Sequence, residues 1–273
     1  MAPIISAADE RLMLAYQEAA LRINRALQDA TPRNRRVILN RIDTLIRELD
    51  ALTAEYIDAT LPLHFQEGTD EAIRDLRNLS GFAASIDESF GVVHQEALQA
   101  LAEEASLKFA TALEGVRSDA RSKLTRMQRE NVVRELISSE VEGANNPSAR
   151  VKAIFEGEKI ESFQGKRRAW GLEEYSSMLT HVLLADAHNT GAVTRYAANG
   201  IQYARRIERP DCCEICRPLR NKYVWIGDRR LIPPSHPYCY GSIAPFIGVP
   251  ENPIMDPFDK RIPERTRRVI LRR

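Results

Sequence analysis

Cysteine is absent before residue 212, and all four cysteines of the chain lie between Cys212 and Cys239. Cysteines gathered in so short a stretch are typical of metal binding in a reducing compartment, and they exclude a secreted disulfide framework. No apolar run approaches the roughly 18–20 residues that a membrane span needs, so we expect no role in a membrane. The first residues, Met1 to Ile5, lack the basic segment and the long apolar core of a signal peptide. We therefore expect a cytosolic product.

An excess of charge of either sign is also missing. The 273 residues include 39 basic and 38 acidic side chains, so the chain as a whole is not a polycation that seeks nucleic acid. Any such contact must come from a local patch. The length and the 44% of hydrophobic residues are sufficient for one large domain or two modest ones with a real core.

The cysteines form part of two short motifs with the spacing of metal ligands. Cys213-x-x-Cys216 is one pair, and His236-x-x-Cys239 follows after residues 217–235. Three thiolates and one imidazole complete a tetrahedral Zn²⁺ site and leave no position for water or substrate. We therefore predict a structural zinc site made by these four residues. Cys212 is the spare thiol. It could serve as a ligand in place of Cys213 only if the first motif lengthened to Cys-x-x-x-Cys.

The alternatives are four unrelated cysteines, a lobe of this kind that has lost its metal, or a redox disulfide between Cys213 and Cys216. A redox Cys-x-x-Cys usually lies between a strand and a helix of a βαβ unit, and no such pattern precedes this one. The two pairs are instead joined by strand-like residues, 222–226, which end at Gly227-Asp228. This arrangement favours a small zinc-stapled β lobe.

The N-terminal half carries helical periodicity. Apolar residues predict helices over residues 8–29 and 33–58. Their seams suit an antiparallel hairpin, or alternatively an interaction stalk. Leu61-Pro62 should end the second helix, a short helix should begin at Gly68, and a long helical region should cover residues 92–140. The basic residues of 117–129 fit either a solvated face or a surface that faces phosphate.

The predicted fold class is α+β and mainly α. A helical region covers residues 1–142 and ends before the break at 143–147. A second domain covers 148–247, with a helix at about 171–198 and the zinc lobe at 201–247. We expect β structure only inside that lobe, with strands near 201–207, 222–226 and 241–246.

Residues 248–273 are predicted to form an extended basic tail, because Pro253, Pro257 and Pro263 interrupt them. From Phe258 onwards, its basic residues outnumber the two acidic ones, Asp259 and Glu264. Without aromatic platforms or a base-reading scaffold, these cations are expected to contact DNA electrostatically and without sequence preference. The predicted DNA-binding residues are Lys260, Arg261, Arg265, Arg267, Arg268, Arg272 and Arg273.

Several of these features occur together in one known family. The run from Phe163 to Trp170, then Tyr175-x-x-Met178-Leu179, Asn189 and Gly200-Ile201, precedes Cys213-x-x-Cys216 and His236-Pro-x-Cys239. In order and spacing these motifs resemble the minor capsid proteins of tailed bacteriophages, the Mu F-like and SPP1 gp7-like head morphogenesis proteins. The resemblance covers about residues 160–247. Family members commonly have Arg and then Cys or His after the last cysteine, where this chain has Tyr240 and Gly241.

The resemblance implies a structural minor head protein that is present in few copies. Such a protein associates with the portal during procapsid assembly in the host cytoplasm, and then lies in the virion, inside the head near the portal vertex. Its implied partners are the portal protein, the major capsid or scaffold protein, and packaged double-stranded DNA, whose packaging or ejection it influences. Some relatives carry a C-terminal toxin or ADP-ribosyltransferase domain. We expect none here, since only 34 residues follow Cys239.

Two enzyme classes share some of these features. His94-Gln95-Glu96 followed by a Cys-x-x-Cys resembles the zinc deaminase signature, but over a hundred residues separate the two parts and Pro210 is displaced from the cysteine pair. An HNH-type nuclease needs a general base, and His236 is already used as a ligand. We predict no enzymatic activity. The competing class is a zinc-stapled nucleic-acid-binding protein without a capsid role, which would bind DNA with salt dependence but would not bind portal.

Overall fold

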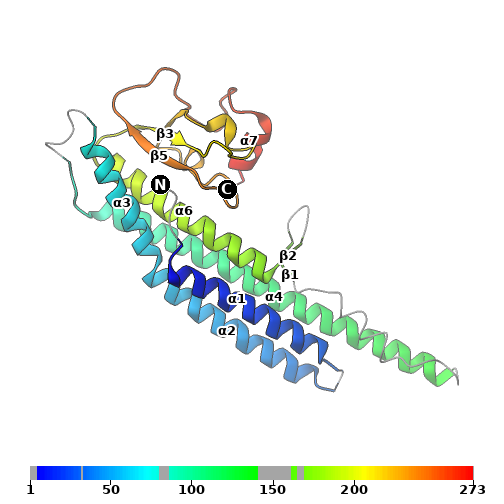
Figure 1. Ribbon diagram of the computed structural model, residues 1–273. Helices are drawn as coiled ribbons and strands as arrows, with labels where there is room; N and C mark the ends of the chain where they lie inside the picture. Colours follow the sequence, from blue (N-terminus) through cyan, green and yellow to red (C-terminus); the bar gives the residue numbers. More distant parts are fainter. Residues whose placement is uncertain (1–4, 32, 80–85, 141–160, 165–168, 273) are drawn as a thin grey trace. The chain divides into compact units, whose positions relative to one another are not determined.

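The computed structural model describes residues 5–31, 33–79, 86–140, 161–164 and 169–272. The helices are α1 (Ala7–Gln28), α2 (Arg35–Ala59), α3 (Leu61–Arg77), α4 (Val92–Glu140), α6 (Leu172–Ala198) and α7 (Glu264–Ile270), shown in Figure 1. The strands are β1 (Glu161–Gln164), β2 (Ala169–Gly171), β3 (Tyr203–Ile207), β4 (Tyr223–Trp225) and β5 (Ser242–Phe246). A mainly helical chain with a small antiparallel sheet near its C-terminus confirms the predicted fold class.

The chain divides into two compact units. The helical unit contains Glu10–Glu55 and Ser106–Ser177, and the lobe unit contains Met1–Asp9, Tyr56–Ala105 and Met178–Arg273. This grouping differs from the predicted domains, because residues from both sides of 142 occur in each unit. The predicted break at 143–147 lies outside the described residues.

In the helical unit, α1 and α2 form an antiparallel pair, and α4 runs antiparallel to α2. The hydroxyl groups of Tyr16 and Thr53 are 2.8 Å apart. Arg117 contacts Asp43 at 3.0 Å, and Arg35 donates to Thr125 at 3.0 Å. The apolar seams of α1 and α2 are buried inside this unit, including Leu12, Ile23, Leu27, Ile38, Ile42, Leu45 and Leu49. The hairpin interpretation is therefore confirmed, and these seams are not available to an external stalk partner.

The basic residues of α4 are largely neutralised by neighbours in the same unit. Besides its contact with Asp43, Arg117 pairs with Glu114, and Lys123 pairs with Asp119 at 3.1 Å. Such pairs on a helix surface are the pattern of a solvated face, which is the interpretation that Arg117 and Lys123 favour.

Strands β1 and β2 form a two-stranded antiparallel hairpin in which Phe163 lies opposite Trp170. The expectation that β structure is confined to residues 201–247 was therefore wrong. Strands of three and four residues are too short for periodicity to reveal them. The available signal was compositional, since Phe163 and Trp170 are both strand-favouring residues.

The predicted helix start at Gly68 was also wrong, because α3 already begins at Leu61 with Pro62 in its first turn. Proline suits that position, since its missing N–H has no partner in the first turn anyway. Gly68 instead serves close packing. A Cβ at Gly68 would lie 1.9 Å from the His188 carbonyl oxygen. A Cβ at Gly191 would lie 2.1 Å from the Phe65 carbonyl oxygen. The two glycines thus let α3 and α6 approach backbone to backbone.

The core of the lobe unit joins helices, sheet and C-terminal segment. The sheet has the order β4-β3-β5, and α3 contributes Ala72 and Leu76 to the same buried cluster as its strands. The cluster also contains Ile254, Ile262 and Ile270 from the segment predicted to be an extended tail. That prediction was wrong: Ile254 bridges to Val224 of β4, and residues 264–270 form α7. Isoleucines spaced eight residues apart bury enough apolar surface to hold a proline-rich segment against the lobe.

A buried polar cluster fixes the start of α1 in the lobe unit. Asp9 accepts hydrogen bonds from Ser6 and from the Tyr56 hydroxyl, each at 2.6 Å, and it lies 3.3 Å from His64. The Ser6–Asp9 contacts are those of a capping box. Burial acts to raise the pKa of Asp9, but the hydrogen bonds from His64, Ser6 and Tyr56 outweigh it and lower that pKa to about 2.

This cluster makes stability sensitive to acid. Because the folded pKa of Asp9 lies below its ordinary value, its contribution is present above about pH 4 and is lost as pH falls towards 2. We expect wild type to lose about 2 kcal/mol more stability than Asp9→Asn between pH 5 and pH 2.5. Urea unfolding at the two pH values measures the difference, with Asp58→Asn, an exposed carboxylate on α2, as the matched control. Equal acid losses in wild type and Asp9→Asn would contradict the assignment.

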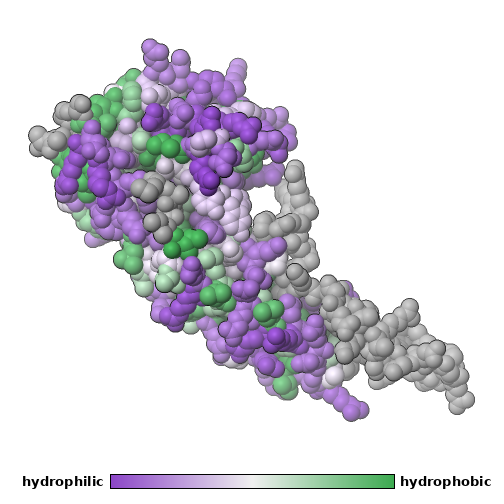
Figure 2. Space-filling model, in the orientation of Figure 1, coloured by the Kyte–Doolittle hydropathy of each residue, from purple (hydrophilic) through white to green (hydrophobic). Residues whose placement is uncertain are grey.

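The surface in Figure 2 is mostly hydrophilic over the described residues, and hydrophobic residues appear as separate patches. The exposed large apolar residues include Leu14 and Leu21 on α1, and Val249, Met255 and Phe258 after β5. None of the described helices combines the length and the apolar character that crossing a bilayer requires.

Candidate metal centre

The sheet register brings the two ligand motifs together. In the antiparallel pair of β3 and β5, Ile207 lies opposite Ser242. The end of β3 and the beginning of β5 are therefore neighbours. The Cys213–Cys216 motif follows β3 and the His236–Cys239 motif precedes β5, so both motifs lie at the same edge of the sheet.

Each motif is a tight turn. The backbone N–H of Arg217 donates to the Cys213 carbonyl at 2.9 Å, and the chain then enters a 3₁₀ turn at Arg217–Leu219. In the second motif the Cys239 N–H donates to the His236 carbonyl at 3.1 Å. Tyr238 has a φ of 56°, a left-handed conformation that non-glycine residues seldom adopt. This conformation closes the turn and brings His236 and Cys239 to one side.

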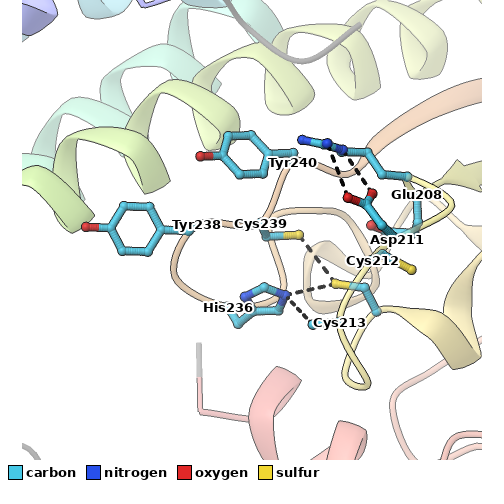
Figure 3. Close-up of a pocket in the computed structure, with 10 residues that line it drawn as sticks. Glu208, Asp211, Cys212, Cys213, His236, Tyr238, Cys239 and Tyr240 are labelled. Atoms are coloured by element: carbon cyan, nitrogen blue, oxygen red, sulfur yellow. Dashed lines mark hydrogen bonds and ion pairs between the residues drawn. The ribbon is translucent and has the colours of Figure 1, made fainter.

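The four predicted ligands converge from these turns, as Figure 3 shows. His236 Nε2 lies 3.0 Å from both Cys213 Sγ and Cys216 Sγ, and Cys216 Sγ lies 3.6 Å from Cys239 Sγ. Tetrahedral bonds of about 2.3 Å to two sulfurs place them about 3.8 Å apart, close to this last distance. The sulfur–sulfur distance thus fits a shared metal ion, and the two nitrogen–sulfur distances would lengthen to about 3.5 Å around one. The structure shows a set of residues able to hold a metal.

The donors differ in exposure and in acidity. Cys216 and Cys239 are buried, whereas Cys213 is exposed. A hydrogen bond from Cys216 lowers the pKa of Cys239 to about 5, against the opposing effect of burial, and backbone hydrogen bonds at Ser235 and Gly241 and the charge of Arg206 assist. The same bond raises the pKa of Cys216. These contacts favour the thiolate form of Cys239, the form in which cysteine binds a metal.

Beneath the cysteines lies an ion pair that the sequence interpretation missed. Arg206 and Glu208 are both buried and paired, and Arg206 also donates to the Leu231 carbonyl at 2.9 Å and to Ser235 Oγ at 3.0 Å. Arg206 thereby ties β3 to the segment that carries His236. Burial raises the pKa of Glu208, and the charge of Arg206 opposes that shift. The available signal was strand alternation, which places Ala204 and Arg206 on one face of β3, with Glu208 directly after the strand ends at Ile207.

The outer wall of the centre is aromatic and polar. A pocket of about 220 Å³ opens over the thiols and is lined on its outer side by Arg209, Asp211, Cys212 and the two tyrosines, Tyr238 and Tyr240. In Figure 3 both tyrosine rings point away from the sulfur atoms, and the ring centroid of Tyr238 lies 5.2 Å from that of His181 on α6. Cys212 belongs to neither group of candidate ligands and stays the spare thiol.

Comparisons with known proteins identify no relative of this chain. No protein-family model, no curated protein and no solved structure matches it.

The remaining sequence-predicted residues lie away from the thiols or are engaged in other contacts. His94 is buried on α4 against Phe90, with ring centroids 5.1 Å apart, and it belongs to neither candidate ligand group. In the C-terminal segment, Arg261 pairs with Asp259, Arg265 with Glu214 and Arg268 with Glu264. Arg267 donates to the Asp259 and Ile262 carbonyls. Lys260 and Arg272 form no ion pair with a described residue, and Arg273 lies outside the described part of the chain.

Proposed function

We propose that the metal is Zn²⁺ and that its role is structural, with Cys213, Cys216, His236 and Cys239 as ligands. Sulfur and imidazole donors at these distances suit zinc better than a hard cation, which prefers oxygen. Four protein ligands leave no open position for a substrate, and the turns that carry them join β3 to β5. A closed site between two strands stabilises a fold and does not catalyse.

We further propose that the protein is a structural minor head protein of a tailed bacteriophage. It would associate with the portal and take part in head morphogenesis and in DNA packaging or ejection. The observation that carries this proposal is that two motifs of the family resemblance, Asn189 of the helix and the Cys/His motif, contact each other. Asn189 of α6 donates to the carbonyl of Gly241, two residues after the last cysteine, at 3.1 Å, so the helix motif and the Cys/His motif meet.

The fold narrows the surfaces that partners would use. Since the seams of α1 and α2 are buried, portal contact would fall on exposed apolar residues such as Leu14 and Leu21, which lie seven residues apart on one face of α1. The major capsid or scaffold protein would be a second protein partner. DNA contact would rest on Lys260 and Arg272, because the other described cations of the C-terminal segment are engaged in ion pairs or bonds to backbone carbonyls.

The test is a pull-down on the portal protein of the same phage, beside a salt series on random duplex DNA. We expect wild type to bind portal, and Leu14→Gln/Leu21→Gln to weaken that binding at least tenfold without changing DNA affinity. Lys260→Gln/Arg272→Gln should leave portal binding intact and flatten the log–log salt slope by about 1.8, since each phosphate that is no longer neutralised accounts for about 0.9. Exposed side chains are replaced because deleting residues 259–273 would remove the buried Ile262 and Ile270.

The absence of portal binding and an unchanged salt slope would contradict different parts of the proposal. DNA binding with a steep salt dependence but without any portal binding would contradict the head-protein proposal and favour a zinc-stapled nucleic-acid-binding protein. An unchanged salt slope in the double variant would contradict the assignment of DNA contact to the C-terminal segment.

A further inference from the structure

The candidate ligands form two overlapping groups of three. One group is Cys213, Cys216 and His236; the other is Glu208, Cys216 and Cys239. Within each group all donor atoms lie within 4.8 Å of one another, and Cys216 belongs to both. The carboxylate of Glu208 is thus as close to the shared sulfur, by this measure, as the thiol of Cys213 is.

Glu208 is held in the manner of a metal-binding carboxylate. Both hydrogen bonds from Arg206 go to Oε1, one of them from Nε at 3.0 Å. Oε2 faces the Gly241 backbone so closely that a Cβ at Gly241 would lie 2.6 Å from it. Carboxylates that ligate a metal through one oxygen are commonly fixed by a hydrogen bond to the other. The orientation of Glu208 is therefore set by Arg206 and by the space that glycine leaves.

Cys213 is the ligand for which a substitute is chemically reasonable. It is exposed, whereas Cys216 and Cys239 are buried and would have to move with the core to leave the metal. Exchange of one thiolate for one carboxylate leaves the net charge of the metal complex unchanged. Zinc bonds to oxygen and to sulfur differ by only a few tenths of an ångström, so the metal itself tolerates the exchange. Glu208 and His236 fall in different groups, so the exchange must bring the carboxylate and the imidazole closer together.

We propose that Glu208 is an alternative fourth ligand of the metal, which takes the place of Cys213 when that thiolate is missing. The metal is then held by Glu208, Cys216, His236 and Cys239. This inference rests on the proposed zinc site and adds to it a buried carboxylate ligand that keeps the metal when the exposed thiolate is removed.

The experiment measures zinc per chain, by elemental analysis after gel filtration, in variants of the full chain. Cys213→Ala should keep about one zinc, and so should Glu208→Gln, because in each case one of the two exchangeable ligands is present. Cys213→Ala/Glu208→Gln should lose the metal, or bind it at least tenfold more weakly in competition with a chromophoric chelator. Glutamine still accepts hydrogen bonds from Arg206, so Glu208→Gln also checks that the substitution is compatible with folding.

Two matched controls test whether another residue of the pocket, Cys212 or Asp211, replaces Cys213 as a ligand. Cys212→Ala/Cys213→Ala should still hold zinc; a metal-free double variant would show that Cys212 is the substitute and would overturn the proposal. Cys213→Ala/Asp211→Asn removes another carboxylate of the same pocket and should also keep the metal. In the Co²⁺-loaded protein, the thiolate charge-transfer absorption of Cys213→Ala should fall by about one third, with tetrahedral d–d bands retained.

The outcomes separate this proposal from the one on which it rests. Wild-type protein without metal would contradict the zinc site itself. Wild type with one zinc and Cys213→Ala with none, or retention of zinc by Cys213→Ala/Glu208→Gln, would overturn the role of Glu208 alone. Loss of metal in Glu208→Gln would show that the carboxylate is required beside Cys213, and would overturn the substitution.

Discussion

Cys216→Ser should lose the metal and unfold at a much lower temperature than wild type. Cys216 belongs to both groups of candidate ligands, so no arrangement of the remaining donors replaces it. Apparent binding free energies of structural zinc are on the order of 10 kcal/mol and are coupled to folding. If only half of that stabilises the folded chain, the melting temperature should fall by about 10–20 °C. Differential scanning calorimetry in metal-free buffer measures the change.

The matched control is Cys212→Ser, which alters the neighbouring thiol outside both ligand groups. We expect its melting temperature to stay within about 2 °C of wild type, because surface substitutions of this kind change stability little. Equal melting temperatures for Cys216→Ser and wild type would show that the thiols meet without a metal to hold them, and the ligand assignment would be wrong.

Gly191→Ala should strongly destabilise the protein, although it adds only one methyl group to a helix. Alanine normally stabilises a helix interior by about 1 kcal/mol relative to glycine. At Gly191, however, the added Cβ would lie 2.1 Å from the Phe65 carbonyl oxygen, and this neighbour is backbone that cannot rotate away. Separating α3 from α6 would disrupt a core that includes Leu76 and Tyr196. We expect a net loss of about 3 kcal/mol or more, at the upper end of overpacking effects.

Chemical denaturation of Gly191→Ala beside Gly91→Ala measures this effect. A Cβ at Gly91 meets no atom within 4 Å, so this second variant should unfold within about 0.5 kcal/mol of wild type. A neutral Gly191→Ala would mean that α3 and α6 do not depend on close approach. Gly68→Ala, which meets the His188 carbonyl from the facing helix, should reproduce the loss.

The sequence predicted the parts of the fold that depend on local pattern. Long helices with buried seams, such as α2 and α4, follow from apolar periodicity alone. Spacing predicted Cys213, Cys216, His236 and Cys239 as a set able to hold a metal, because metal ligands recur at short fixed intervals. The structure adds the reason that the two pairs meet, which is the pairing of β3 with β5. That pairing is a long-range contact, and no local pattern encodes it.

The failures came from features that depend on tertiary contacts. Gly68 was interpreted as a helix start because acidic residues follow it, as in a first turn, yet its role is to admit a neighbouring backbone. The segment after residue 248 was interpreted as extended because of its prolines, but its spaced isoleucines join the core. Glu208 was overlooked because a lone carboxylate carries no ligand spacing. Its position opposite Cys216 arises only when β3 is folded against the two ligand turns.

The measurement that tests this account most directly is the metal content of wild-type protein purified without added metal. We expect about one zinc per chain, retained through gel filtration, and we expect chelation to abolish the cooperative unfolding of the lobe unit. Protein that carries no metal, refuses Zn²⁺ and Co²⁺ under reducing conditions, and still unfolds cooperatively would contradict the central claim that Cys213, Cys216, His236 and Cys239 form a metal centre.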